Sequence, residues 1–262
     1  GKRVAAFGSL PFAVTSSQSV GGVKLERDWG EIGDTLAGVV TLAGDAPTPG
    51  QNVVVSLLDR RGRELVRQTI PAKPETPFAV KLEPWMPMLL TVRAALVEAA
   101  APGWQQEVAS AWQFAHVVKR HRGQFNFLMW DTPRGNLAPA AEESLARNSV
   151  TLQLGGGAPP PYIAAQDIAW IPYTTDIVNR RDEQGVMKPC CWNDEAAIQA
   201  RVDEIVQKHL PARRHGVFVY SLGDEIAVRG SCLSSQCLAA YQRYLQDQYQ
   251  DIAALNASWG SH

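Results

Sequence analysis

The sequence predicts a β-sandwich followed by a parallel β/α domain, and two observations support this prediction. From about residue 23 to residue 118, short runs alternate apolar and polar residues and are separated by clusters of Gly, Pro and Asp. After Gly123, continuous apolar runs alternate with segments that have helical spacing. The first pattern is typical of an immunoglobulin-like or jelly-roll sandwich, and the second indicates a sheet built from β/α units.

Composition narrows the class of protein. The 262 residues can hold one large domain or two ordinary ones, and 45% hydrophobic residues with a net charge of −1 are typical of a globular protein. The sequence has no basic stripe of the kind that binds nucleic acid, and no apolar run approaches the roughly 18 residues of a membrane span. We therefore predict no nucleic-acid partner and no membrane span. Because the first residue is Gly rather than Met, we expect a mature or excised piece of a longer chain.

The N-terminal domain is predicted from its alternating runs. Residues 1–20 are expected to be a lead-in segment, because Pro11 and the polar tract 15–19 prevent a long element. The β-sandwich domain is predicted over residues 21–118, and residues 59–62 (Asp-Arg-Arg-Gly) are a turn signal within it. We expect Trp112 and Phe114 to lie in the core, on the burial tendency of aromatic residues. The predicted strands cover residues 36–42, 53–57, 78–82, 90–96 and 112–116.

A basic segment, residues 119–123 (Lys-Arg-His-Arg-Gly), marks the predicted domain boundary. It is too short for a nucleic-acid patch, and we interpret it as a solvated linker. The second domain is predicted over residues 119–262, with the order β-α-β-(α)-β-α-β-α. Four such units are half of an eight-stranded (β/α)8 TIM barrel. The expected strands are residues 125–130, 150–154, 168–173 and 217–222, and the expected helices are residues 140–148, 162–167, 194–210 and 235–250.

Two acids follow the fourth predicted strand directly. The apolar run 217–222 leads into Asp224 and Glu225, and the carboxyl ends of parallel strands are where barrels and open sheets build their sites. The alternative is an ordinary strand whose acids cap the next segment. Asp131 follows the first strand and could line a subsite, with Trp130 as a stacking platform, and Tyr173 after the third strand is a candidate of the same kind.

Four stretches of sequence resemble glycoside hydrolase family 42, the β-galactosidase-type (β/α)8 barrels. They are residues 191–194 (Cys-Trp-Asn-Asp), 223–225 (Gly-Asp-Glu), 232–241 (Cys-Leu-Ser-Ser-Gln-Cys-Leu-Ala-Ala-Tyr) and 251–260, which end in Trp-Gly. The resemblance implies a retaining hydrolase of β-linked glycosides in which Glu225 is the general acid/base. Asp224 stands where the family usually has an asparagine that holds the sugar 2-hydroxyl. The family's nucleophile follows the seventh strand, beyond this chain, so the 262 residues alone are expected to be inactive.

Two partners follow from this interpretation. One is a carbohydrate substrate, and the other is the remainder of the barrel or a second copy of the chain, because an open half-barrel would expose strand edges and apolar faces. The rival hypothesis is a non-catalytic carbohydrate-binding or structural protein that retains the barrel fold. The aspartate at position 224 and the missing nucleophile favour this hypothesis.

All four cysteines lie in the last third of the chain: Cys190, Cys191, Cys232 and Cys237. In the resembling family four cysteines can bind zinc, and Cys191, Cys232 and Cys237 match three of them. Ser234 stands in the remaining place, for which Cys190 could substitute, since structural zinc takes four ligands. A disulfide between the two loops and unbonded thiols are the alternatives. The zinc would be structural, because glycoside hydrolysis requires no metal or other cofactor.

Overall fold

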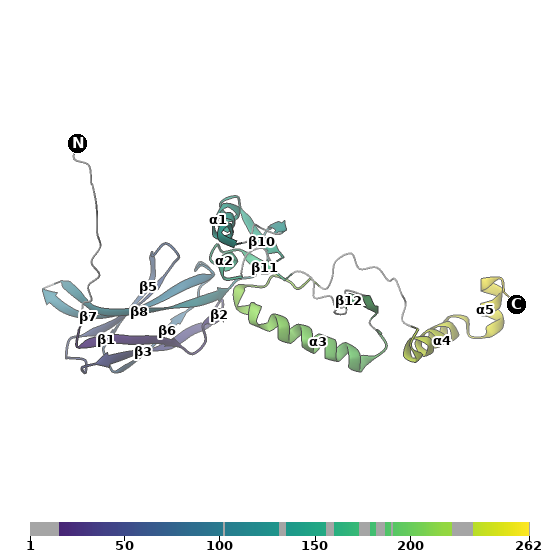
Figure 1. The fold of residues 1–262 in the computed structure, drawn as a ribbon, viewed down its shortest axis with the longest axis horizontal. Helices are drawn as coiled ribbons and strands as arrows, with labels where there is room; N and C mark the ends of the chain where they lie inside the picture. The colour runs from purple at the N-terminus through teal and green to yellow at the C-terminus, as the bar shows by residue number, and fades with distance from the viewer. Residues whose placement is uncertain are drawn as a thin grey trace. The chain divides into compact units, whose positions relative to one another are not determined.

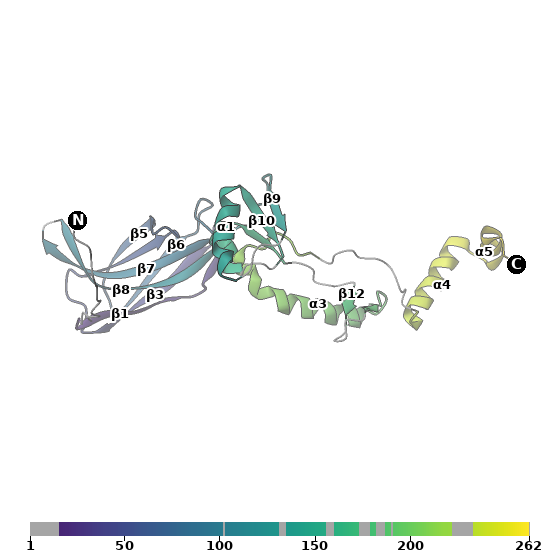
Figure 2. The ribbon, with the colours of Figure 1, turned by 45° about the horizontal axis from the view of Figure 1, so that its top comes forward.

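A computed structural model gives the fold of two compact units, Gly1–Val117 and Val118–His262. Figures 1 and 2 show the helices and strands of both units. The structure describes residues 16–101, 103–130, 135–155, 160–172, 179–181, 187–189, 191–221 and 233–261.

The first unit is an antiparallel β-sandwich. One sheet has the order β1-β3-β6 and the other has the order β2-β8-β7-β4-β5. Four of the five predicted runs of this domain lie within a strand, the run 78–82 extends one residue beyond β6, and the structure adds β1, β2 and β5. β1 begins three residues before the predicted domain start at residue 21. The strands are β1 (Gln18–Leu25), β2 (Trp29–Glu31), β3 (Thr35–Gly44), β4 (Asn52–Leu58), β5 (Glu64–Pro71), β6 (Glu75–Lys81), β7 (Leu89–Ala101) and β8 (Trp104–Val118).

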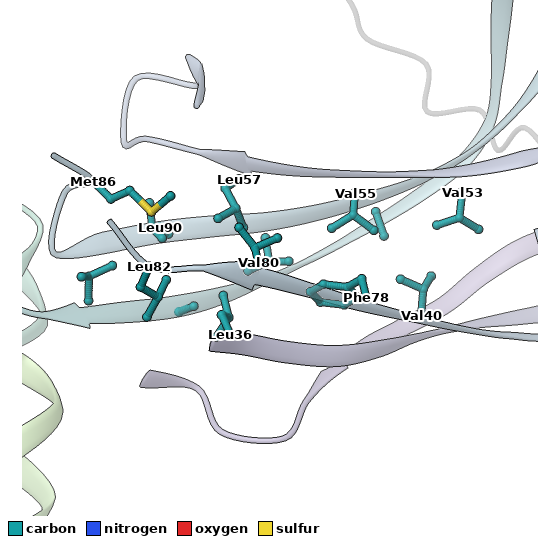
Figure 3. Close-up of a cluster of buried hydrophobic side chains, with 14 residues drawn as sticks. Leu36, Val40, Val53, Val55, Leu57, Phe78, Val80, Leu82, Met86 and Leu90 are labelled. Carbon is teal, nitrogen blue, oxygen red and sulfur yellow. The ribbon is translucent and has the colours of Figure 1, made fainter. Parts of the chain in front are cut away.

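The core of the sandwich is formed by the apolar row of each strand. Leu36 and Val40 of β3 pack with Phe78 of β6 and with Val53 and Leu57 of β4, as Figure 3 shows. Successive side chains of a strand point to opposite faces of its sheet, so every second residue of these strands faces the opposite sheet. Gly38 has no side chain because a Cβ there would lie 2.6 Å from the Lys24 carbonyl oxygen and 2.9 Å from Cζ of Phe78.

The predicted turn after β4 is built on Asp59. Its Oδ1 accepts hydrogen bonds from the backbone N–H groups of Arg61 (2.8 Å) and Arg63 (2.9 Å), and its Oδ2 accepts one from Nε of Arg63 (2.6 Å). Gly62 donates its N–H to the Asp59 carbonyl and has a φ of 75°, a left-handed conformation that favours glycine. This turn joins β4 to β5 as an antiparallel hairpin.

The prediction that Trp112 and Phe114 lie in the core is wrong. Their side chains are 61% and 47% exposed, whereas Ala115 and Val117 of the same strand are in the core. Burial tendency alone assigned the two large rings to the inner face. A strand has two rows of side chains, and here the small residues fill the inner row.

The second unit contains a parallel sheet in the order β9-β10-β11. Its strands pair in chain order, and α1 and α2 lie between consecutive strands in the sequence, as the β/α pattern predicted. α5 and a short β12–β13 hairpin were not predicted. The elements are β9 (Phe127–Trp130), α1 (Ala138–Arg147), β10 (Val150–Leu154), α2 (Pro160–Ala164), β11 (Ala169–Ile171), β12 (Asn179–Arg181), β13 (Met187–Pro189), α3 (Glu195–His209), α4 (Ser235–Tyr249) and α5 (Ile252–Trp259), with 3-10 turns at Gly135–Leu137 and Leu210–His215.

The predicted fourth strand is much shorter in the described part of the chain. Val217 forms a single parallel bridge with Trp170, and the N–H of Phe218 donates to the Trp170 carbonyl (2.9 Å). The neighbour, β11, has only three residues, so it offers few backbone groups for pairing. Position 222, the end of the predicted strand, lies outside the described residues. The bridge still places this segment beside β11, in chain order and parallel.

The interpretation of the basic segment as a solvated linker is wrong for Lys119 and His121, whereas Arg122 and Gly123 are exposed. Nζ of Lys119 lies 3.2 Å from a carboxylate oxygen of Asp167, and its side chain is only 12% exposed. Nε2 of His121 is 2.7 Å from the Asp167 carbonyl oxygen, and Arg122 donates to the Phe218 carbonyl (3.1 Å). These bonds attach the segment to the parallel sheet of the second unit.

Candidate functional site

One face of the parallel sheet is covered by helices. Ala138 of α1 and Ile163 of α2 form a buried cluster with Ile168, against which Trp170 of β11 packs. The indole N–H of Trp170 donates to the Gly155 carbonyl (2.6 Å) at the end of β10. Figure 1 shows α1 and α2 beside β10 and β11. This is the helical layer of a β/α protein.

The other face of the sheet is apolar. Leu152, Ala169 and Ile171 form a buried cluster, with Leu154 and Phe218 packed against it. In a parallel sheet, paired residues point to the same face, so Leu128, paired with Leu152, and Trp130, paired with Leu154, belong to this face. Both side chains are exposed. An apolar face of this kind is what the interior of a barrel presents.

Trp130 is the predicted substrate-binding residue that the structure describes. It is the last residue of β9, at the carboxyl end of the strand, and its side chain is 57% exposed. The other predicted residues of this site, Asp131, Tyr173, Asp224 and Glu225, lie outside the described residues, and their positions remain predictions.

His209 and Tyr220 meet near the fourth parallel segment. Their rings are 6.0 Å apart in an edge-to-face arrangement, at the end of α3 and three residues after Val217. Burial lowers the pKa of His209, and the positive charge of Lys208 lowers it further. His209 is therefore a neutral, half-buried residue at the edge of the unit, and ring packing is its observed contact.

Cys191 and Cys237 come together although 46 positions separate them. Their sulfur atoms are 3.5 Å apart, the amide of Asn193 donates to Sγ of Cys237 (3.4 Å), and Oγ of Ser234 is 3.1 Å from Sγ of Cys191. Cys191 lies just before α3, and Cys237 lies in the first turn of α4. Both helices have side-chain caps: Asp194 accepts from the N–H of Ala197, and Ser234 accepts from that of Cys237.

The sulfur atoms of Cys191 and Cys237 are in contact without a bond between them. Two thiolates bound to one zinc at about 2.3 Å in tetrahedral geometry lie roughly 3.8 Å apart, close to the separation observed here. A disulfide bond between these two residues would require about 2.05 Å. Among the described residues no group of three or more His, Cys, Asp or Glu is arranged to hold a metal ion. Cys190 and Cys232, the other predicted ligands, lie outside the described residues.

Ser234 has a role that the sequence did not reveal. Its hydroxyl oxygen accepts the N–H of Cys237 at 3.2 Å and also lies against Cys191. A serine directly before the first residue of a helix is a recognisable capping signal, because its hydroxyl can accept the N–H of the third helical residue, here Cys237.

An ordered parallel sheet with helices on one face and an apolar opposite face defines a β/α protein. A family model described as β-galactosidase, glycoside hydrolase family 42, matches residues 111–262. The chain belongs to this glycoside hydrolase family, which confirms the resemblance in its sequence. No curated protein matches the chain.

Solved glycosidase structures are more distant. The β-glucuronidase of Bifidobacterium dentium in complex with coumarin-3-O-glucuronide is 17% identical, with a TM-score of 0.36, and the match covers 90% of this chain and 42% of that one. The β-D-glucuronidase of Dictyoglomus thermophilum is 12% identical, with a TM-score of 0.36 and coverage of 90% and 43%. The chain thus spans less than half the length of these proteins, and its assignment rests on the family model.

Among the described residues, no helix is both long and apolar enough to cross a membrane.

Proposed function

We propose that the chain forms the N-terminal part of a retaining glycoside hydrolase that acts on β-linked glycosides, with Glu225 as the general acid/base. The observation that carries the proposal is the family match over residues 111–262, which includes the parallel sheet and the segment that leads to Glu225. The parallel bridge at Val217 supports it, because the chain there runs in the direction of β9–β11. Residues that follow such a segment belong to the carboxyl edge, where barrel sites are built.

The second unit, in this proposal, supplies the first four β/α units of a (β/α)8 barrel. The exposed apolar side chains Leu128 and Trp130 support this, because the remaining units of a barrel would cover the face that they share with Leu152. Alternatively, a second copy of the chain would cover this face. Light scattering after size exclusion distinguishes the two, since a monomeric chain excludes self-pairing.

Glu225 would protonate the glycosidic oxygen and then activate water for the second step. The adjacent Asp224 would favour the protonated form of Glu225 through like-charge repulsion and would accept a hydrogen bond from the substrate. The nucleophile, a second carboxylate about 5–5.5 Å away, would come from chain that follows residue 262. Trp130, Asp131 and Tyr173 would line the sugar subsites.

The test compares leaving groups in a protein that contains these residues and a complete barrel. Glu225→Gln is expected to reduce kcat/KM on a phenyl β-galactoside by about 10²–10⁴-fold, the usual contribution of general acid catalysis. The loss should be much smaller in the first step with a dinitrophenyl galactoside, whose leaving group needs no proton. Glu75→Gln, at an exposed position of the sandwich, is the matched control. Equal activity of Glu225→Gln and wild type on the phenyl substrate would refute the assignment of Glu225. Absence of hydrolysis by the wild-type protein itself would favour the non-catalytic alternative.

Cys191 and Cys237 are proposed to be two ligands of a structural zinc, completed by Cys232 and Cys190. The 3.5 Å separation of the two sulfur atoms supports this, as does the amide N–H of Asn193 directed at one of them. When bound, the metal would fasten the segment before α3 to the first turn of α4. It would take no part in hydrolysis, for which the two carboxylates suffice.

A further inference from the structure

The outer face of the five-stranded sheet carries an exposed aromatic pair, Trp112 and Phe114 of β8. Their ring centroids are 4.9 Å apart and the ring planes meet at 59°. Both side chains point away from the core because Ala115 and Val117 occupy the inner row of the same strand. Two large rings side by side leave apolar surface in contact with water, and a ligand that covers them would remove this surface from water.

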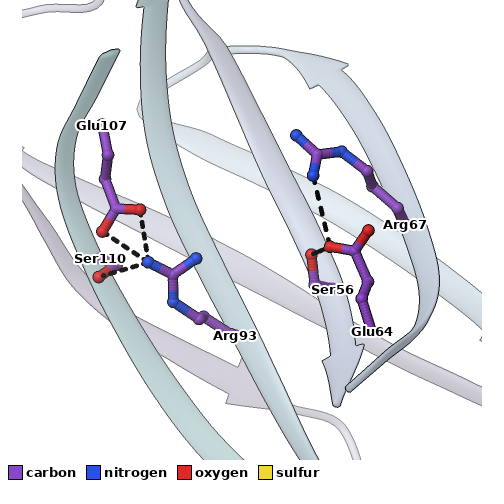
Figure 4. Close-up of polar contacts among 6 residues, drawn as sticks. All are labelled: Ser56, Glu64, Arg67, Arg93, Glu107 and Ser110. Carbon is purple, nitrogen blue, oxygen red and sulfur yellow. Dashed lines mark hydrogen bonds and ion pairs between the residues drawn. The ribbon is translucent and has the colours of Figure 1, made fainter. Parts of the chain in front are cut away.

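Polar groups flank the pair in fixed positions. Arg93 of β7 is directly opposite Trp112, and Thr91 is opposite Phe114. Nη2 of Arg93 donates to both carboxylate oxygens of Glu107 and lies 3.4 Å from Oγ of Ser110 (Figure 4). Within the described part of the chain, Nε and Nη1 of Arg93 have no acceptor. They remain able to donate to a ligand hydroxyl.

The charge on this face is balanced. Burial raises the pKa of Glu107, but the hydrogen bonds from Arg93 and Ser110 outweigh it and hold the pKa below its usual value. Glu107 is therefore ionised at neutral pH and neutralises Arg93. On the same face, Glu64 accepts from Ser56 (2.6 Å) and pairs with Arg67 (3.4 Å), so a second acid and base also cancel. A neutral ligand is complementary to such a face, whereas an anionic one would meet an arginine that is already paired.

The size of the surface excludes a typical protein partner. Aromatic side chains have about 150–250 Å² each, so exposures of 61% and 47% leave roughly 200 Å² of ring surface. A stable protein interface buries about 800 Å² on each partner. Further along the face, Val54, Ala95 and Val97 form a cluster that is already buried, so the exposed apolar surface does not continue there. A surface of this size matches the C–H faces of one or two pyranose rings.

We infer that Trp112 and Phe114 of the first unit, with Arg93 beside them, form a binding platform for a neutral oligosaccharide. The rings stack on the apolar faces of the sugar, and the guanidinium donates to its hydroxyl groups. The class of ligand rests on the proposed function, since the chain belongs to a β-galactosidase family. The position of the platform rests on the sheet geometry alone.

Affinity gel electrophoresis of the 262-residue chain tests the platform, with soluble β-1,4-galactan as the neutral probe and polygalacturonate as the anionic one. Galactan is expected to retard the chain, and polygalacturonate is expected to have little effect. Trp112→Ala or Phe114→Ala should weaken the retardation about tenfold, the loss of roughly one ring contact. Trp112→Phe should retain part of it. Trp85→Ala, at a similarly exposed tryptophan (59%) between β6 and β7, is the matched control.

Three results would overturn the inference: no retardation by galactan, equal retardation of Trp112→Ala and wild type, or stronger retardation by polygalacturonate. Thermal unfolding followed by circular dichroism shows whether each variant is folded. Phenyl galactoside hydrolysis by the longer protein should be unchanged in Trp112→Ala and reduced about 10²–10⁴-fold in Glu225→Gln. Failure of the platform and failure of the catalytic proposal are therefore observed separately.

Discussion

Replacing Asp59 by alanine removes the acceptor that organises the β4–β5 turn. The residue is only 6% exposed and accepts three hydrogen bonds, two from backbone N–H groups and one from the side chain of Arg63. Both backbone donors bind Oδ1, and Arg63 binds Oδ2. Asp59→Asn therefore keeps the backbone bonds through its own Oδ1 and loses the bond to Arg63, which separates the two contributions.

The expected magnitude follows from where each bond lies. The backbone N–H groups belong to an exposed turn that water can reach, so their loss resembles the loss of a helix cap, about 1 kcal/mol. The Arg63 side chain is 73% exposed, which limits its ion pair to less than about 1 kcal/mol. Asp59→Ala should then cost roughly 2 kcal/mol and Asp59→Asn less than about 1 kcal/mol. For a unit of about 100 residues, each kcal/mol lowers Tm by about 4–8 °C.

The same residue predicts a dependence on pH. Burial raises the pKa of Asp59, but the hydrogen bonds from Arg63 and Arg61 outweigh it and hold the pKa below its ordinary value. The stabilisation is therefore complete above the unfolded-state pKa of about 3.9 and is lost as the pH falls through the lower folded-state pKa. The stability difference between wild type and Asp59→Ala should shrink below about pH 4.

Scanning calorimetry measures the transition of the sandwich, and hydrogen exchange followed by mass spectrometry reports on β4 and β5 directly. Asp45→Asn, at an exposed position of the β3–β4 loop, is the control and should change stability by less than about 0.5 kcal/mol. If Asp59→Ala unfolds at the wild-type temperature, or loses as much stability at pH 3 as at pH 7, the reasoning about this turn is refuted.

Three further predictions concern the second unit. Cys191→Ser and Cys237→Ser should each lower the zinc content of purified protein from about one ion per chain, measured by plasma mass spectrometry, because each removes one of four ligands. Asp167→Asn should destabilise the unit by about 1 kcal/mol in urea unfolding, because it leaves the largely buried Lys119 without its ionised partner. Trp130→Ala should raise KM for phenyl galactoside in the longer protein and leave the melting temperature nearly unchanged, because the exposed ring would stack on the substrate and not on the core.

Matched variants separate these effects from general destabilisation. Ser234→Ala removes the α4 cap, so it should lower stability by about 1 kcal/mol and leave zinc bound. Glu143→Gln breaks an exposed ion pair and should have little effect in the urea experiment. Full zinc content in Cys237→Ser would contradict the metal assignment, and an unchanged KM in Trp130→Ala would remove that residue from the substrate site.

Local patterns predicted the elements that depend on local physics. β10 coincides with the predicted residues 150–154 because turn residues bound a short apolar run. α3 begins after Asp194, as predicted, since that side chain caps the helix and helical spacing follows it. The fourth strand was predicted too long, because its length depends on how many residues its neighbour β11 offers.

Contacts between residues far apart in the sequence could not be predicted from local patterns. The basic segment looked solvated because four of its five residues are basic and the side-chain partners of Lys119 and Arg122 are far away in the sequence. Asp167 lies 48 positions from Lys119, and Phe218 lies 96 positions from Arg122. The outward row of β8 was missed for a related reason, since which of two rows faces the core depends on the opposite sheet.

Ser234 is interpreted differently from the sequence and from the structure. As a zinc ligand, Ser234 is a loss, because a hydroxyl replaces a thiolate. As a cap, it is an ordinary first choice, and its hydroxyl oxygen contacts both the N–H of Cys237 and the sulfur of Cys191. The serine hydroxyl therefore contacts both the start of α4 and the segment before α3. A zinc ion bound by Cys191 and Cys237 would add a second link between the same two segments, which Ser234 already joins through its contact with Cys191.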